Sequence, residues 1–428
     1  MMKKHLLALS AAAVLLAPQA VGAEGFSINE WSAEGFAMGG ARMFAENDAA
    51  NMAYNPASLT KIKGEVAKIS ATYISPHGKY KTYGIADGKD NDGNPTFSDA
   101  AMNYTTTGNN KVHPAWAPGS YYAKQLNEKE YIGFGVYSRF GNACFFEAGS
   151  LPGTNNAGAK INGISLGVNY AKKLDRKWAA SLGAEVNYVG LIADKSPMVG
   201  AGQFGHVHIE GESYALGWNA AANYAFDDKN EIGVVYRSKV KHSMEAEYDA
   251  HGMSTLINPM YGDSYGVVTL PESIMIGYGH KFNDRTRVEL NGTWTRWSRF
   301  DRFDIYNTGD LPNSLSERNW KDGWRYAIGI EHKLSDKYSL LGGIAYDESS
   351  IPDYPEKNGA DFLVPTGTRT TFTIGTQYHD DRHTLAFAVG YMKVGDLHIG
   401  ESHGTAYHHA DMYDSYTKLF SISYQYNF

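Results

Sequence analysis

The last eight residues of the chain, SISYQYNF (Ser421–Phe428), alternate strictly between polar and apolar side chains. The apolar set has even numbers and is rich in rings: Phe420, Ile422, Tyr424, Tyr426 and Phe428. Successive side chains of an extended chain point to opposite faces. A period of two therefore predicts a strand with one apolar and one polar face.

The same alternation recurs through much of the chain. In Tyr214–Phe226 the even positions include Tyr, Leu, Trp and Phe, while the odd positions carry Ala, Gly and Asn. The pattern returns in the segments 164–170, 324–331, 371–378 and 385–391. Repeated segments of this kind predict an all-β protein.

The connections between these segments are of two kinds. Six are short charged turns, at 127–130, 175–177, 227–230, 283–285, 335–337 and 380–382. Seven are long and rich in Gly, Pro and Asp, at about 76–115, 141–160, 193–211, 241–270, 300–320, 350–367 and 395–412. Short and long connections alternate, so together they join fourteen strands. This sorting is typical of a transmembrane β-barrel with periplasmic turns and outer loops. A soluble β protein, which is the alternative, has no reason to sort its loops.

The start of the chain indicates export. Lys3 and Lys4 precede an apolar run at 6–16, and small residues follow at 21–23. This order is typical of a secretory signal peptide, and the apolar run is too short to span a membrane. We therefore expect 1–23 to be a cleaved signal peptide.

The composition narrows the class further. The single cysteine, Cys144, excludes an internal disulfide bond. The net charge of −7 argues against nucleic acid as a partner, because nucleic acid requires a basic face. The 46 Gly, 30 Tyr and 18 Phe fit barrel strands whose outer face meets lipid and whose inner face is wet. A closed barrel is also the only β structure that leaves no open edge in lipid.

Residues 24–62 do not alternate and are rich in Ala and Gly, with a break at Asn55–Pro56. One interpretation is a periplasmic tail. The other is a plug inside the lumen, because a barrel of this width is either open or plugged. With the plug, the domains are the signal peptide at 1–23, a hatch at 24–62 and a barrel with long extracellular loops at 63–428.

Several segments resemble, in the same order, the outer-membrane long-chain fatty acid and hydrocarbon transporter family (FadL). They are Gly25–Glu30, Asn47–Ala50, Tyr54–Leu59, Gly133–Gly141, Leu270–Glu272, Trp294–Phe300, Trp320–Arg325, Tyr346–Pro352 and Val364–Pro365. The terminal Phe428 likewise resembles an outer-membrane assembly signal. The resemblance implies a fourteen-stranded antiparallel barrel with an N-terminal hatch, in agreement with the number of strands that the connections indicate.

The resemblance also implies a function. We expect passive uptake of hydrophobic molecules, above all long-chain fatty acids, across the outer membrane of a Gram-negative bacterium. A ligand would be caught on the loops, would bind in the lumen and would leave sideways through the barrel wall. The expected partners are fatty acids or hydrocarbons together with outer-membrane lipid and lipopolysaccharide, and we expect a monomer without a cofactor. The alternative is a general porin or a surface adhesin barrel.

By the same resemblance, the lateral opening would lie at a kink formed by Phe140, Gly141 and Asn142, and Gly141 would permit a break in the strand ladder. The alternative is that Gly141 merely begins an outer loop. Asn55, Pro56 and Ala57 would set the turn of the hatch, or would serve only as a break between elements.

Two arginines are candidates for binding a ligand carboxylate. Arg139 shares the parity of Gly133, Gly135 and Tyr137, which predicts a lumenal side chain, and it stands where the family often has Pro or Asn. Arg318 lies near the family's basic residue beside the ligand head group. For either arginine, the alternative is an ion pair with a carboxylate of the wall.

Enzymatic and metal sites are not indicated. The histidines His206, His208, His398, His403, His408 and His409 fall in loops or loop edges without a fixed geometry, so we predict no metal site. No G-x-S-x-G, P-loop or His-Glu-x-x-His motif is present. We therefore expect no enzyme, although a barrel lipase with a Ser-His pair in the wall stays open as an alternative.

Overall fold

The structure is a computed structural model that describes residues 25–91, 95–200, 203–253, 259–352, 359–365, 367–400 and 406–428. The expected signal peptide at 1–23 and the loop residue His403 lie outside the described residues. Within these ranges, no helix is both long and apolar enough to cross a membrane.

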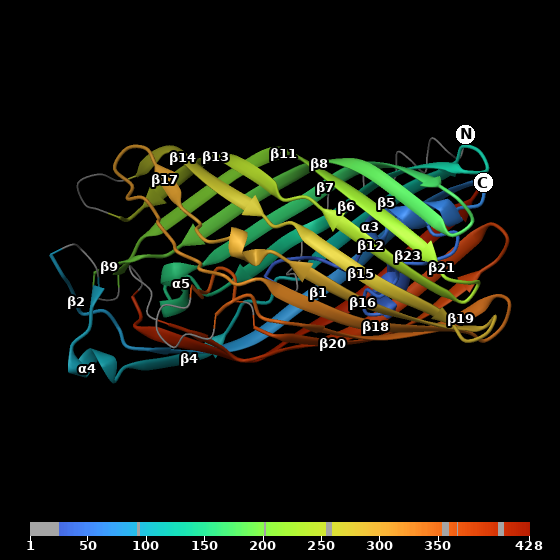
Figure 1. The fold of residues 1–428 in the computed structure, drawn as a ribbon. Helices are drawn as coiled ribbons and strands as arrows, with labels where there is room; N and C mark the ends of the chain where they lie inside the picture. The colour runs from blue at the N-terminus through green and yellow to red at the C-terminus, as the bar shows by residue number, and fades with distance from the viewer. Residues whose placement is uncertain are drawn as a thin grey trace.

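Fourteen antiparallel strand tracks close into a barrel (Figure 1). Two tracks are interrupted: β12 (Asn230–Arg237) continues as β13 (Val240–His251), and β14 (Met260–Leu270) continues as β15 (Ser273–Lys281). The other twelve are β1 (Glu65–Tyr83), β5 (Ala115–Gln125), β6 (Glu130–Phe145), β7 (Gly158–Lys173), β8 (Trp178–Lys195), β11 (His206–Ala225), β16 (Thr286–Thr295), β18 (Gly323–Lys333), β19 (Tyr338–Asp347), β20 (Arg369–His379), β21 (His383–Val394) and β23 (His409–Asn427).

The long connections contain shorter helices and strands. They are β2 (Gly88–Lys89), β3 (Pro95–Thr96), α4 (Asp99–Met102), β4 (Thr105–Asn109), α5 (Leu151–Asn155), β9 (Met198–Gly200), β10 (Gln203–Phe204), η2 (Trp297–Arg299), β17 (Ile305–Asn307) and β22 (Leu397–Ile399).

The last strand closes the barrel, as its sequence predicts. β23 pairs with β21 on one side and with β1 on the other, where Val66 lies opposite Asn427 and Thr72 lies opposite Ser421. Ser421 is fully buried toward the lumen, whereas Phe420 is 39% exposed on the outer face. The outer face is therefore apolar and the inner face polar, as a strand between lipid and lumen requires.

The six short turns and seven long connections fall at the predicted places. One prediction is wrong in detail, because most of the expected loop at 241–270 belongs to β13 and β14. In β13 the apolar side chains point inward, as at Met244 and Tyr248, while Glu245 and Glu247 are exposed on the outside. This pattern is the reverse of that in the lipid-facing strands, so the segment lacks the apolar outer face by which the sequence predicts the other strands.

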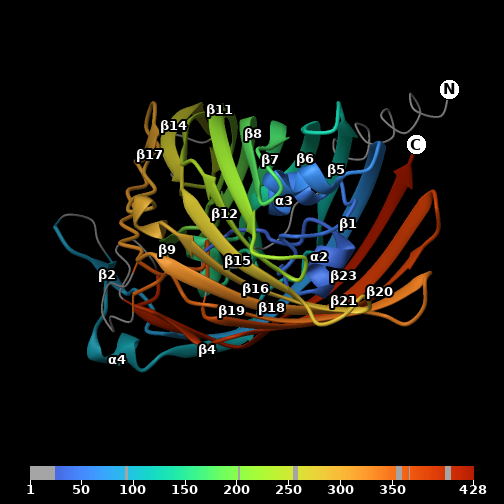
Figure 2. The same ribbon diagram turned by 45° about the vertical axis from the view of Figure 1, so that its right-hand side comes forward.

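The segment before β1 lies inside the barrel (Figure 2). It contains α2 (Ala33–Ala37), α3 (Asn51–Tyr54) and η1 (Pro56–Lys61), and every residue of these three elements except Lys61 is buried. Glycines in the wall allow the close approach. A side chain at Gly343 of β19 would collide with the backbone of Met38.

Candidate functional site

A large cavity opens at the end of the barrel that carries the long loops. Its volume is about 1440 Å³, and we call it the vestibule. The side chains at its floor come from β8 and from three separate long connections, and they include Lys195, Phe303, Arg318, Asp361, Leu363 and Ala406. The loops thus form a wide mouth above the lumen.

The vestibule floor carries a buried pair of opposite charges, Arg318 and Asp361, together with the partly buried cation Lys195. Arg318 is only 1% exposed, and its guanidinium lies 2.8 Å from the Asp361 carboxylate. The Nζ atom of Lys195 donates a 3.0 Å hydrogen bond to Ser314 and interacts electrostatically with both Arg318 and Asp361. Lys195 is therefore a second cation in the neighbourhood of the Arg318–Asp361 pair. The predicted ligand residue Arg318 is thus paired with a carboxylate of a long connection rather than of the wall, and Lys195 adds a second positive charge beside this pair.

An apolar chamber lies next to the vestibule floor. Phe303, Arg318 and Leu363 line both spaces, so they form the boundary between them. The remaining lining of the chamber is entirely aliphatic or aromatic, and consists of Ile161, Val189, Leu191, Met244, Val268, Phe300 and Val364. The chamber has a free volume of only about 10 Å³. Side chains nearly fill it, so a ligand can enter only if they move.

One ring of the hatch lies at the centre of an aromatic cluster beside this chamber. Phe26 is 1% exposed, and its ring centroid lies 4.8 Å from that of Trp297 and 5.4 Å from that of Phe300. Phe140 of β6 and Trp320 complete the cluster, with centroids 6.0 and 6.3 Å from Phe26. The N-terminal part of the hatch thus joins the chamber to β6.

The wall is interrupted beside this cluster. The ladder between β5 and β6 ends at the pair Gly119–Tyr137. The register between β6 and β7 shifts between Tyr137 and Phe140, and beyond the shift β6 continues its ladder with β7 but not with β5, while Phe145 makes an isolated bridge to Lys111. The irregularity therefore lies at Ser138 and Arg139, immediately before the predicted kink residues.

The hatch occupies the edge of β6 that β5 leaves free. The Ile28 N–H donates to the Arg139 carbonyl over 2.8 Å, and the Gly141 N–H donates to the Phe26 carbonyl over 2.8 Å. Trp31 Nε1 adds a 2.7 Å hydrogen bond to the Ser138 carbonyl. These bonds make a short antiparallel bridge between hatch and wall, so Gly141 lies at the contact of two backbones.

Asn142 connects the kink to the vestibule. Its Nδ2 atom donates a 2.8 Å hydrogen bond to the carbonyl of Leu363. Leu363 lines the vestibule and the chamber, and Asp361 in the same loop pairs with Arg318. The three predicted kink residues thus lie together, next to the hatch and to the loop of Asp361 and Leu363 that lines the vestibule.

Arg139 pairs with the wall. Its Nη1 atom lies 3.0 Å from Glu185 of β8, and Arg237 lies 2.6 Å from the same carboxylate. Tyr137 donates to Glu185 over 2.9 Å, and Arg237 also donates to the Ala53 carbonyl of the hatch over 2.5 Å. Arg139 therefore takes the wall-carboxylate alternative, within a buried network that links the kink to the hatch.

The segment Asn55–Ala57 forms a turn, as predicted. The Asn55 side-chain oxygen accepts from the Ala57 N–H over 3.1 Å, and Pro56 occupies the first turn of η1, where its missing N–H costs nothing. The Asn55 amide also donates to Asn223 of β11 over 2.7 Å. The turn is thereby fixed to the wall.

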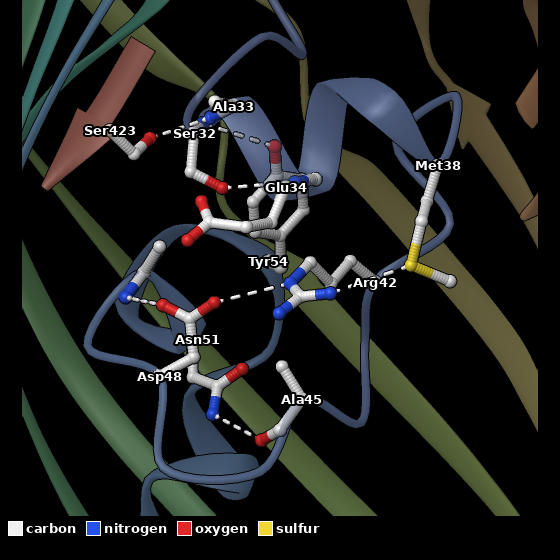
Figure 3. Close-up of polar contacts among 12 residues, drawn as sticks. Ser32, Ala33, Glu34, Met38, Arg42, Ala45, Asp48, Asn51, Tyr54 and Ser423 are labelled. Carbon is white, nitrogen blue, oxygen red and sulfur yellow. Dashed lines mark hydrogen bonds and ion pairs between the residues drawn. The ribbon is translucent and has the colours of Figure 1, made fainter. Parts of the chain in front are cut away.

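A second charged network holds the middle of the hatch, from Glu34 to Asp48 (Figure 3). Arg42 lies 3.1 Å from Asp48, and Lys68 of β1 lies 2.7 Å from Asp48 and 2.9 Å from Glu34. Glu289 of β16 accepts from the Met43 N–H over 2.6 Å. Burial alone would raise the pKa of Asp48, but Lys68 and Arg42 outweigh it and hold that pKa well below its usual range.

The loop histidines pair with neighbouring side chains. His208 lies 2.6 Å from Asp194, and His398 lies 2.8 Å from Asp411. Within the described ranges, no three His, Cys, Asp or Glu side chains converge as a metal site would require. Cys144 is a free thiol, buried just beyond the kink.

Sequence reasoning missed Lys195, Glu185, Arg237 and Phe26. Glu185 could have been found, because a carboxylate on the lumenal face of a strand must have a partner. Lys195 and Arg237 stand singly at strand ends, where charges are common, so neither gives a distinctive signal. The role of Phe26 depends on rings far away in the sequence.

A closed barrel with an apolar outer face, a polar lumen and an internal hatch defines an outer-membrane protein of the transport type. Residues 13–428 match the family model described as outer membrane protein transport protein (OMPP1/FadL/TodX). The long-chain fatty acid transport protein of Escherichia coli O6:H1 is 24% identical over 462 aligned positions, which cover 98% of each chain. The chain therefore belongs to the OMPP1/FadL/TodX family of outer-membrane transporters of hydrophobic substrates.

Solved structures show the same fold. A Pseudomonas aeruginosa FadL homologue superimposes with a TM-score of 0.80 at 17% identity, covering 94% of this chain and 100% of that chain. The Pseudomonas putida toluene transporter TodX superimposes with a TM-score of 0.69 at 16% identity, covering 93% of this chain and 98% of that chain.

Proposed function

We propose that the protein takes up long-chain fatty acids passively, by capture in the vestibule, binding in the lumenal chamber and lateral exit at the kink. The observation that carries this proposal is the end of the β5–β6 ladder at Gly119–Tyr137, directly beside the hatch and the aromatic cluster. A wall that loses its ladder next to an apolar chamber and an aromatic cluster offers a path into lipid.

The path suits a hydrophobic ligand for a simple reason. Each buried CH₂ group is worth about 0.8 kcal/mol, so a fatty acid resists a water-filled pore. A path that runs from an apolar chamber directly into the bilayer keeps the ligand out of water. The ligand would then pass directly among the acyl chains of the membrane lipids.

The charge of the vestibule floor favours an anionic head group. Arg318 pairs with Asp361 beside apolar walls, and Lys195 adds a second positive charge near this pair. A ligand carboxylate would supply the missing negative charge through charge-assisted hydrogen bonds. A neutral hydrocarbon, such as the substrate named for TodX, would gain nothing from this excess.

The hatch (24–62) would act as the plug. Its N-terminal part fills the lumen at Phe26 and occupies the edge of β6 at Ile28, so transport requires this part to move. The alternative of a general porin is disfavoured because a porin keeps a polar, open constriction. We further propose that the protein works as a monomer, since one chain supplies the whole path.

Uptake of radiolabelled oleate tests the proposal in a Gram-negative host that lacks its own fatty acid transporter. The wild-type chain should restore uptake, and Gly141→Val should abolish it by placing a bulky side chain where the hatch and β6 backbones meet. Gly292→Val is the matched control, because a Cβ atom there has only an ordinary 3.7 Å contact with Trp324. Absence of uptake by folded wild-type protein would exclude fatty acids and favour neutral hydrocarbons.

A further inference from the structure

The outer surface of the barrel carries a group of lysines on three neighbouring strands, β21, β23 and β1. Lys393 is exposed on the outer face at the loop end of β21, and Lys418 is exposed on the outer face at the middle of β23, where that strand runs beside the loop end of β21. Lys393 lies opposite Tyr416, and Lys418 lies opposite Tyr391, so the two lysines are diagonal neighbours. Lys79 and Lys81 continue the group along the outer end of β1.

Stacked rings form a shelf among these lysines. Tyr416 lies at its centre, with the His77 ring stacked 4.8 Å away at 13° and the Tyr391 ring stacked 5.6 Å away at 21°. The Nζ atom of Lys418 lies over the Tyr416 ring, 5.8 Å from its centroid. The rings thus restrict the lysine stems and present a flat, amphipathic surface.

The two central lysines keep their charges available. Among the residues that the structure describes, no carboxylate forms an ion pair with Lys393 or Lys418. Lys79, in contrast, lies 3.0 Å from Asp414. A lysine pair without a counterion on a sheet face has the charge that recognises a phosphorylated head group.

The surface below the lysines is apolar. Val389 and Phe420 are 50% and 39% exposed, directly toward the short-turn end from Tyr391 and Lys418. Tyr73 and Trp116 extend this band across β1 and β5, with ring centroids 5.2 Å apart. Toward the outside, the apolar band is therefore followed by a layer in which rings and lysines alternate, which matches the acyl chains and then the phosphorylated sugars of a glycolipid.

The opposite side of the barrel has the reverse charge. On the outer faces of β11 and β13, Glu210 lies opposite Glu247 and Glu212 lies opposite Glu245. Such a surface repels phosphate. The basic shelf is thus confined to one side of the wall.

We propose that the shelf of Lys393, Lys418, Tyr391, Tyr416 and His77 is a binding site for one phosphorylated glycolipid of the outer leaflet, of the lipid A type. The lysines bind its phosphates, the rings pack on its sugar, and Val389 and Phe420 contact its acyl chains. The site lies on the lipid side of the wall and does not depend on the substrate that passes through the lumen.

Native mass spectrometry of the detergent-purified full chain tests the proposal. The probes are bisphosphorylated lipid A and the same lipid A after enzymatic removal of its phosphates. The wild-type chain should retain one bisphosphorylated lipid, and Lys393→Gln/Lys418→Gln should weaken its retention about 10-fold or more, since each lysine near an anionic lipid surface contributes to binding. The dephosphorylated lipid should bind weakly to both proteins.

Lys239→Gln/Lys241→Gln is the matched control, because these exposed lysines lie on the acidic side of the barrel. This control should bind the bisphosphorylated lipid as the wild type does. Heat-modifiable gel mobility should show that all three proteins are folded. Equal retention by both double variants, or equal binding of the two lipids, would overturn the proposal.

Discussion

The Gly141 N–H donates a 2.8 Å hydrogen bond to the Phe26 carbonyl, so the hatch forms part of the ladder that β6 lacks. The reciprocal bond runs from the Ile28 N–H to the Arg139 carbonyl. Between these bonds, Ser27 and Phe140 form an isolated antiparallel bridge. One short contact therefore holds the hatch to the wall at the place where the ladder to β5 is missing.

A disulfide bond across this bridge should lock transport. Ser27 and Phe140 form a non-hydrogen-bonded pair, whose Cα atoms are typically about 4.5 Å apart and within the range of a disulfide. In a Cys144→Ala background, Ser27→Cys/Phe140→Cys should lose nearly all oleate uptake when oxidised and recover it when reduced, because the hatch can then leave β6. Uptake by cells with and without reductant measures the difference.

The control places the same chemistry in an intact part of the wall. Leu290 and Ile328 lie opposite each other on β16 and β18, where the ladder is continuous. A disulfide between cysteines at these positions should leave uptake unchanged. If the oxidised Ser27→Cys/Phe140→Cys variant transports oleate as fast as the same variant after reduction, the hatch contact is not a gate.

Lys195→Met should separate anionic from neutral substrates. The variant removes the positive excess at the vestibule floor but leaves the Arg318–Asp361 pair in place. We expect oleate uptake at low substrate concentration to fall roughly 5-fold, the loss of about one charge-assisted contact, while toluene uptake does not change. Lys239→Met, an exposed lysine remote from the vestibule, is the control. An equal fall for both substrates would mean that Lys195 has only a structural role.

The sequence predicts the barrel well because each strand lies between lipid and lumen. That position makes apolar and polar side chains alternate along each strand. In the closing strand, Phe420 is exposed on the outer face and Ser421 is buried toward the lumen, as the alternation predicts. The pattern fails where the wall rises above the membrane, as at Met244 in β13, because there the outside is wet. Where neither face of a strand meets lipid, nothing requires its outer side chains to be apolar and its inner side chains to be polar.

The site was harder to predict because its contacts join distant parts of the chain. The sequence placed Arg139 in the lumen but could not identify its partner, since Glu185 lies two strands away. The kink residues Phe140–Asn142 were near the true irregularity because Gly is expected at a bend. Phe26 packs among four rings that are far from it in the sequence and come together only when the barrel closes, so no local sequence pattern predicts this contact.

Removal of Glu185 should destabilise the barrel. This carboxylate pairs with both Arg139 and Arg237, and its side chain is fully buried. Glu185→Gln leaves two buried guanidinium groups without a charge partner, a change that typically costs about 3–5 kcal/mol. Urea unfolding in detergent, followed by tryptophan fluorescence, should show the loss. Glu245→Gln, at an exposed position on β13, should unfold as the wild type does.

The middle of the hatch, which Asp48 ties to Lys68 and Arg42, should stay bound to the wall under mildly acidic conditions. The pKa of Asp48 is lower in the folded protein than in the unfolded chain, mainly because Lys68 and Arg42 overcome the effect of burial. Its pairs therefore stabilise the fold at every pH above the unfolded value of about 3.9, and this contribution is lost only as the pH falls through the depressed folded value. Protection of the hatch from proteolysis should accordingly be the same at pH 7 and pH 5. In Asp48→Asn, protection should be weaker at both values, because Lys68 and Arg42 lose their shared partner. A wild-type hatch released between pH 7 and pH 5 would show that another group, and not Asp48, controls the anchor.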